Sequence, residues 1–140
     1  MRDHPESLEA TGALLSRHGI TPTRQRIDIA RALFGSPGHL SADQVLAVVN
    51  ERRPATSKAT VYNTLKLFRD RGLVREVIAN PNKVFYDPNT APHYHFYNVD
   101  TGELTDIDAR SVEVTGLPTL PEGTVTEGVD VIVRLRSRAE

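Results

Sequence analysis

The chain has 140 residues, of which 39% are hydrophobic and 25% charged, and it contains no cysteine. This length suits one ordinary domain or two small ones. The missing cysteines exclude disulfides, thiolate zinc sites and cysteine nucleophiles, so a bound metal would need imidazole and carboxylate ligands. No apolar run is long enough to cross a membrane, and no N-terminal stretch resembles a signal peptide. We therefore expect a cytoplasmic protein with no membrane partner.

The net charge of −1 hides a division between the two halves of the chain. Residues 1–86 hold 13 Lys and Arg against 8 Asp and Glu, a net charge of +5, whereas residues 87–140 hold 4 against 10, a net charge of −6. A basic half suits a polyanion such as DNA, and an acidic half suits cations.

Helix signals dominate the first seventy residues. Four amphipathic stretches are each bounded by capping residues or by glycine. In chain order, the boundaries are Gly19 after the first stretch, residues 21–23 and Gly35 around the second, Ser41 with Gln44 before the third, and Ser57 and Gly72 around the fourth.

A predicted β-hairpin follows these helices. Residues 73–78 and 83–86 are rich in β-branched and aromatic side chains and flank an Asn-Pro-Asn turn. Helices followed by a hairpin are typical of a winged helix-turn-helix domain. The proline-containing and asparagine-containing stretch at 79–91 is the only linker-like segment, so we place the domain boundary there.

The fourth predicted helix is the candidate recognition helix. Lys58, Tyr62, Lys66 and Arg69 fall within about 80° of one another on a helical wheel and form one polar stripe. Because such a helix enters the major groove by its N-terminus, we expect Lys58, Tyr62 and Asn63 at base edges and Lys66 and Arg69 at phosphates. A charged stripe is also what an ordinary solvated helix face shows, but the basic charge and the hairpin favour DNA contact.

Five residues of metal-ligand type form a candidate metal site: His39, Asp87, His93, His95 and Asp106. The two histidines of the His-x-His segment share one face of an extended chain. A hairpin closed by the Asp-Thr-Gly turn after Val99 would place His95 opposite Asp106. His39 could join them only through tertiary contact. Taken singly, each residue is explained as a loop, cap or strand residue; as a set they favour a metal site.

Three segments together resemble the ferric uptake regulator superfamily: Thr-Pro-Thr-Arg-Gln-Arg from residue 21, Ser-Lys-Ala-Thr-Val-Tyr-Asn-Thr-Leu from residue 57, and His-Tyr-His from residue 93. The resemblance runs from about residue 8 to 136. It implies an α+β fold with a winged-helix DNA-binding domain at 1–80, a hinge at 81–92 and a small α/β dimerisation and metal-sensing domain at 93–140. It also implies a homodimeric transcription regulator that binds an inverted-repeat DNA operator, with no enzymatic activity and no small-molecule substrate.

The resemblance assigns the superfamily's regulatory metal site to the same five residues, with ligands from both domains. Mn(II) or Fe(II) is the expected metal, and Zn(II) could replace it in vitro. The sequence departs from the family pattern in three places, which limits how many of the family's site residues can be assigned to this chain. The chain has no four-cysteine structural zinc site, and Pro92 and Tyr94 stand where an accessory site would have ligands, so we expect one metal per subunit. Thr21 replaces a basic residue proposed to enter the minor groove, which leaves Arg24 or Arg26 to contact the DNA backbone.

The signal that the metal reports is open at this point. Aspartate at position 106 resembles the peroxide-sensing repressors, in which His39 and His93 would be the oxidation targets. The absence of cysteine also resembles iron-response regulators, some of which answer to haem. Two readings outside these are a metal-independent winged-helix protein and an enzyme with a mononuclear metal centre. Five protein ligands leave little open coordination for the enzyme.

The C-terminal end carries a predicted strand. Val129, Val131, Val133 and Leu135 alternate with residues of the opposite face, which gives one apolar face. A sheet shared between two subunits would cover that face, and two operator half-sites need two recognition helices. Prolines between residues 117 and 123 break any long helix before this strand.

Overall fold

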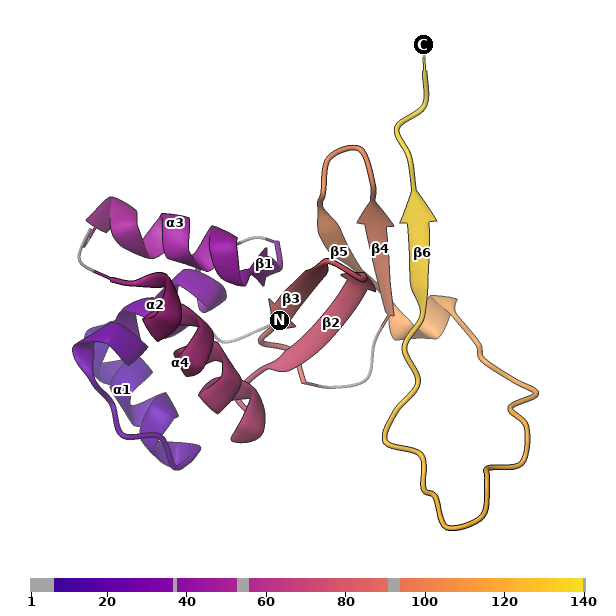
Figure 1. The fold of residues 1–140 in the computed structure, drawn as a ribbon, viewed down its shortest axis with the longest axis horizontal. Coiled ribbons are helices and arrows are strands. Elements are labelled where there is room, and N and C mark those ends of the chain that lie inside the picture. Colours follow the sequence, from indigo (N-terminus) through magenta and orange to yellow (C-terminus); the bar gives the residue numbers. More distant parts are fainter. Residues whose placement is uncertain (1–6, 37, 53–55, 91–93, 140) are drawn as a thin grey trace. The chain divides into compact units, whose positions relative to one another are not determined.

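A computed structural model describes residues 7–36, 38–52, 56–90 and 94–139 (Figure 1). The chain forms two units, Met1–Thr90 and Ala91–Glu140. Within the described residues, the first unit contains four α-helices and a three-stranded sheet, and the other contains a second three-stranded sheet with a short 3-10 turn. This α+β content confirms the predicted fold class. His93 of the predicted metal site lies outside the described residues.

The described residues of the N-terminal unit form four helices: α1 (Leu8–Arg17), α2 (Arg24–Phe34), α3 (Ala42–Arg52) and α4 (Lys58–Asp70). The last three begin where the capping signals predict, and the N-cap of α1 is Ser7, for which no signal was predicted. Thr23 and Ser57 accept hydrogen bonds from the backbone N–H groups three residues on, and Ser41 and Gln44 form the reciprocal capping box. None of the described helices has the length and apolar character needed to cross a membrane.

The first sheet contains the predicted hairpin. Strands β2 (Arg75–Asn80) and β3 (Lys83–Asp87) pair antiparallel, and the two-residue strand β1 (Leu40–Ser41) adds to the other edge of β3. Part of the segment predicted as a hinge is therefore strand β3, and the two units divide after Thr90. The pairing of Leu40 with Tyr86 brings the residue before β1 beside the residue that ends β3.

A single apolar cluster holds the N-terminal unit together. It includes Leu15 of α1, Leu33 of α2, Val45 of α3 and Phe68 of α4, each of which is at most 1% exposed. Leu65, also of α4, is completely buried. Burial of such a side chain contributes roughly 1.5–3 kcal/mol, so this packing fixes the orientation of α4 in its unit.

The C-terminal unit is built on β4 (Tyr94–Asn98), with β5 (Leu104–Ile107) antiparallel on one side and β6 (Ile132–Leu135) parallel on the other. His95 pairs with Asp106, which is the predicted register of the hairpin. The 3-10 turn η1 (Ala109–Ser111) follows β5.

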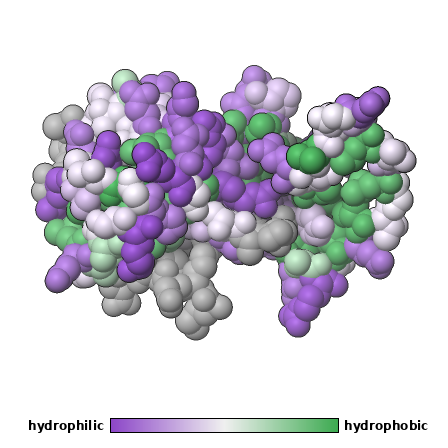
Figure 2. Space-filling view, turned by 90° about the horizontal axis from the view of Figure 1, so that it is seen from below, coloured by the Kyte–Doolittle hydropathy of each residue, from purple (hydrophilic) through white to green (hydrophobic). Residues whose placement is uncertain are grey.

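Residues 112–131, between η1 and β6, contain no helix or strand (Figure 1). The predicted strand at 129–136 is shorter than expected, because only Ile132–Leu135 pair with β4. Leu117 is 60% exposed and Val125 is 90% exposed. Figure 2 shows hydrophobic side chains on the surface of the C-terminal unit.

Candidate metal ligands and nucleic-acid interface

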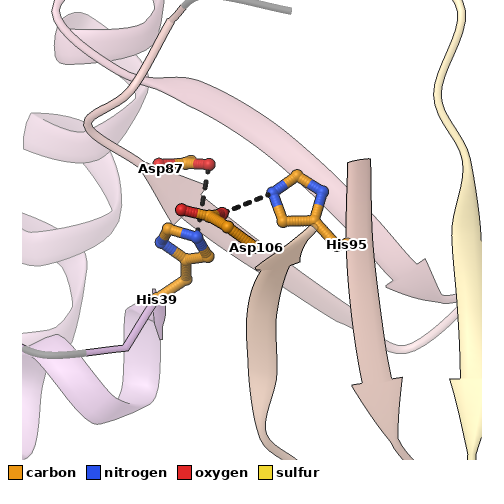
Figure 3. A group of neighbouring side chains, drawn as sticks. All are labelled: His39, Asp87, His95 and Asp106. Atoms are coloured by element: carbon orange, nitrogen blue, oxygen red, sulfur yellow. Dashed lines mark ion pairs between the residues drawn. The ribbon is translucent and has the colours of Figure 1, made fainter. Parts of the chain in front are cut away.

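The first pair of candidate ligands, His39 and Asp87, lies within the N-terminal unit (Figure 3). The Nε2 atom of His39 is 3.3 Å from Oδ2 of Asp87, and the two side chains are 3% and 0% exposed. Asp87 Oδ1 accepts a hydrogen bond from the backbone N–H of Asn89 at 2.9 Å. The pairing of β1 with β3 creates this contact, because it joins segments that are far apart in the sequence.

The second pair, His95 and Asp106, lies within the C-terminal unit (Figure 3). The Nε2 atom of His95 is 3.4 Å from Oδ1 of Asp106, and their side chains are 2% and 38% exposed. The two residues face each other across β4 and β5. Directly opposed residues in an antiparallel pair project from the same face, so the hairpin register alone produces this contact.

The donor atoms of both pairs suit a divalent metal. Each pair offers one imidazole nitrogen and one carboxylate oxygen, the ligand types that Mn(II), Fe(II) and Zn(II) accept in the absence of thiolates. Two adjacent ligand atoms bound at about 2.1 Å to one metal are about 3.0–3.6 Å apart, a range that includes the separation within each pair. A buried carboxylate such as Asp87 also requires a compensating positive charge or hydrogen bonds.

The polar stripe of α4 is exposed on its N-terminal half. Lys58 has 66% of its side chain exposed and Tyr62 is 42% exposed. Asn63 and Lys66 are exposed as well. These four residues form what we call the reading face. The opposite side of the helix, with Val61, packs into the apolar cluster.

Arg69 differs from the rest of the stripe because two carboxylates hold its guanidinium. Its Nη1 donates to Glu76 at 2.7 Å and its Nη2 donates to Asp70 at 2.9 Å. These contacts, with the Glu76 hydrogen bond first, raise the pKa of Arg69. A phosphate would have to compete with both carboxylates, so Arg69 is less available for DNA than the sequence suggests.

Arg24 and Arg26, the other candidate DNA contacts, also have partners within the chain. Arg24 Nε lies 3.2 Å from Oδ1 of Asp28, one helical turn away. Arg26 donates from Nη1 to the backbone carbonyl of Thr21 at 2.9 Å. Both contacts are exposed to solvent, where an ion pair or a hydrogen bond contributes little stability.

No pattern in the sequence singles out Asp43 as a residue that contacts the polar stripe of α4. Its Oδ1 accepts a hydrogen bond from the Tyr62 hydroxyl at 3.3 Å and lies 3.7 Å from Nζ of Lys58. The sequence shows Asp43 only as an acid in the first turn of a helix. Its contact with a residue nineteen positions away depends on how α3 packs on α4.

Tyr86 and Asp108 also have shifted pKa values. Burial raises the pKa of the Tyr86 phenol above its ordinary value. The hydrogen bond from Arg110 lowers the pKa of Asp108 at the start of η1. Neither residue belongs to the predicted sites.

Comparison with known proteins places these features in a family. Residues 17–130 match the model of the Ferric uptake regulator family. The chain is 36% identical over 104 residues to the peroxide-responsive repressor PerR of Staphylococcus epidermidis, an alignment that covers 74% of this chain and 68% of that protein.

Solved structures share the fold. The ferric uptake regulator of Pseudomonas aeruginosa with manganese has a TM-score of 0.66 at 22% identity, with 92% of this chain and 98% of that chain covered. The ferric uptake regulator of Vibrio cholerae, which shows rearranged DNA-binding domains, has a TM-score of 0.69 at 20% identity, with 90% and 98% covered. At these identities the likeness establishes the α+β arrangement of a winged-helix unit and a small C-terminal unit.

Proposed function

The chain belongs to the ferric uptake regulator family, and we propose that it is a metal-activated repressor that binds an inverted-repeat DNA operator as a homodimer. Membership makes it a metal-responsive, DNA-binding transcription regulator and not an enzyme. The observation that carries the proposal is the presence in each unit of a His and Asp pair with metal-ligand chemistry. In addition, α4 has an exposed polar stripe.

We propose further that one metal is shared by the two units. Its ligands would be His39 and Asp87 from the first unit and His93, His95 and Asp106 from the second. Mn(II) or Fe(II) is the proposed metal, and Zn(II) would also bind in vitro. Ligands on both sides of the boundary at Thr90 would favour one orientation of the units. The stabilisation follows RT ln(1 + [M]/Kd), or roughly 2.7 kcal/mol at about a hundredfold excess over Kd.

The reading face supplies the proposed DNA contacts. Lys58, Tyr62 and Asn63 stand at the N-terminal half of α4, where a recognition helix meets base edges, and Lys66 one turn later would meet a phosphate. Arg24, Arg26 and Arg69 are proposed backbone contacts that first have to leave their carboxylate or carbonyl partners.

The proposed signal is peroxide acting on the iron-loaded protein. The likeness to a peroxide-responsive repressor supports this choice over the iron or haem signal. Bound Fe(II) would supply the reaction with peroxide. The residues of this chain that would then be oxidised are His39 and His93: each imidazole ring would gain one oxygen atom from one peroxide molecule, water would be released, and the oxidised ring would be lost as a ligand.

A binding experiment tests the proposal. A random duplex pool is enriched with the Mn(II)-loaded protein, and the affinity for the selected duplex is then measured with Mn(II), with Fe(II) under anaerobic conditions, and with chelator. We expect binding to be roughly tenfold tighter, or more, with metal, which corresponds to about 1.4 kcal/mol. The ligand variants Asp87→Asn and His95→Gln should lose that gain, whereas His18→Gln, a histidine outside the site, should keep it.

Two outcomes would contradict the proposal. Equal affinity with metal and with chelator would favour a metal-independent winged-helix protein. Retention of the metal effect in both ligand variants would place the metal elsewhere.

Peptide mass analysis of the Fe(II)-loaded protein after peroxide treatment tests the proposed signal. Unmodified His39 and His93 would contradict peroxide sensing.

A further inference from the structure

Asp43 connects the two side chains at the start of the reading face. It lies in the first turn of α3, and its Oδ1 accepts from the Tyr62 hydroxyl at 3.3 Å and lies 3.7 Å from Lys58 Nζ. The same Nζ is 5.7 Å from the centre of the Tyr62 ring. Three side chains from two helices therefore form one connected group at the exposed surface.

The charge of Asp43 is unexpected at this position. Its side chain is 70% exposed, so its negative charge would face the phosphates of any DNA that approaches Lys58 and Tyr62. A carboxylate near phosphate is unfavourable, and its cost applies to every duplex sequence. An acid in the first turn of a helix does interact favourably with the helix dipole. That interaction does not require the contacts with Lys58 and Tyr62.

The surroundings of Asp43 place it between α4 and the hairpin. Asp43 and Tyr62 line a cavity of about 420 Å³ whose other walls include Asn82 of the β2–β3 turn and Lys83 and Tyr86 of β3. All of these residues belong to the N-terminal unit. The carboxylate therefore lies beside both the start of α4 and the β2–β3 hairpin.

We propose that Asp43 determines how well the reading face discriminates between DNA sequences, an inference that rests on the proposed function. It acts as a positioning residue for two groups. Its carboxylate holds the Tyr62 hydroxyl and the Lys58 ammonium in place before DNA binds, which lowers the ordering cost of specific contacts. Its charge repels the phosphates of every duplex, so tight binding also requires the base contacts that the two positioned side chains make.

The test compares Asp43→Asn and Asp43→Ala in the full chain loaded with Mn(II). The probes are the selected duplex and a scrambled duplex of the same length and composition, each measured over a range of salt concentrations. The matched control is Glu51→Gln, which removes one exposed carboxylate from the same helix about 12 Å farther along its axis.

We expect both Asp43 variants to bind the scrambled duplex roughly three to ten times more tightly than the wild type, because a repulsive charge is gone. The ratio of scrambled to selected dissociation constants should fall by about tenfold, because Tyr62 and Lys58 lose the positioning that favours the selected duplex. The Ala variant should also bind the selected duplex more weakly, since Tyr62 loses its acceptor. Glu51→Gln should leave the ratio unchanged.

A Tyr62→Phe background separates positioning from charge. It removes the hydroxyl that Asp43 holds, so the effect of Asp43→Asn on the ratio should become smaller in the double variant. The inference is overturned if the ratio is unchanged in both Asp43 variants while the wild type discriminates. It is also overturned if the melting temperature falls with no change in the ratio, the result for a residue that only stabilises α3. A wild type that does not discriminate would overturn the proposed function and this inference together.

Discussion

The two units of the chain bury apolar surface to very different extents. The apolar cluster contains 15 residues, every one of them within the N-terminal unit. In the C-terminal unit, Val133 and Leu135 of β6 are each 38% exposed, although they belong to the sheet. The N-terminal unit thus has a core of its own, and the C-terminal unit leaves much of its apolar surface in contact with solvent.

This difference indicates how the work is divided between the units. A unit of about fifty residues buries a small fraction of its surface and is only marginally stable alone, and a small sheet needs a covering layer. In a family whose members act as dimers, a second copy of the chain is the natural cover for β6. We therefore expect one unit to be self-sufficient and the other to depend on a partner.

The largest expected effect is in the core of the N-terminal unit. Phe68→Ala removes a completely buried ring from α4 and should lower the free energy of unfolding by about 3–5 kcal/mol. Urea unfolding followed by the helical circular dichroism signal measures this. The matched control is Phe96→Ala in β4, where the ring is 36% exposed, and the helix transition should be unchanged. Equal losses in the two variants would refute the contrast between the units.

The sequence predicts the features that depend on contacts between residues close together in the chain. The caps at Thr23, Ser41 and Ser57 define helix starts by contacts between residues three positions apart, so the helices could be read directly. The contact of His95 with Asp106 followed from one turn and the alternation of strand faces.

The features that the sequence does not predict depend on packing between segments that are far apart in the chain. Only the addition of β1 to β3 puts His39 beside Asp87, and no local pattern indicates a two-residue strand there. The capture of Arg69 by Glu76 likewise depends on how α4 lies against β2. The prolines between residues 117 and 123 predict only that no long helix forms there, and not that the whole stretch 112–131 is irregular.

The next effect tests the partner of the C-terminal unit. Leu135→Asp places a charge on β6 in both subunits of a dimer, and should weaken association by about 3 kcal/mol, or roughly a hundredfold. Sedimentation velocity over a range of protein concentrations measures it. Val125→Asp is the control, because Val125 is already 90% exposed in the irregular connection. If Leu135→Asp remains as dimeric as the wild type, β6 is not covered by a second copy.

Metal removal tests whether metal binding makes the two units unfold in one cooperative transition. With about a hundredfold excess of Mn(II) over Kd, we expect about 2.7 kcal/mol of added stability and a single unfolding transition for both units. Chelator should restore separate transitions, and Asp106→Asn should reduce the gain. Calorimetry with His18→Gln as the control distinguishes these states. Stabilisation of one unit alone would mean that its pair binds metal without the other.

The smallest effect concerns the start of α4. Ser57 accepts a hydrogen bond from the Thr60 N–H at 3.1 Å, so Ser57→Ala should cost about 1 kcal/mol of stability. Ser57→Asn retains an acceptor and should recover most of it. The corresponding change in the other unit, Asp108→Asn at η1, should have no measurable effect, since the turn is exposed and short. Because Lys58 and Tyr62 lie in the first two turns of α4, loss of the cap should also weaken binding to the selected duplex. A lower melting temperature with unchanged DNA affinity would show that the reading face does not depend on a well-ordered helix start.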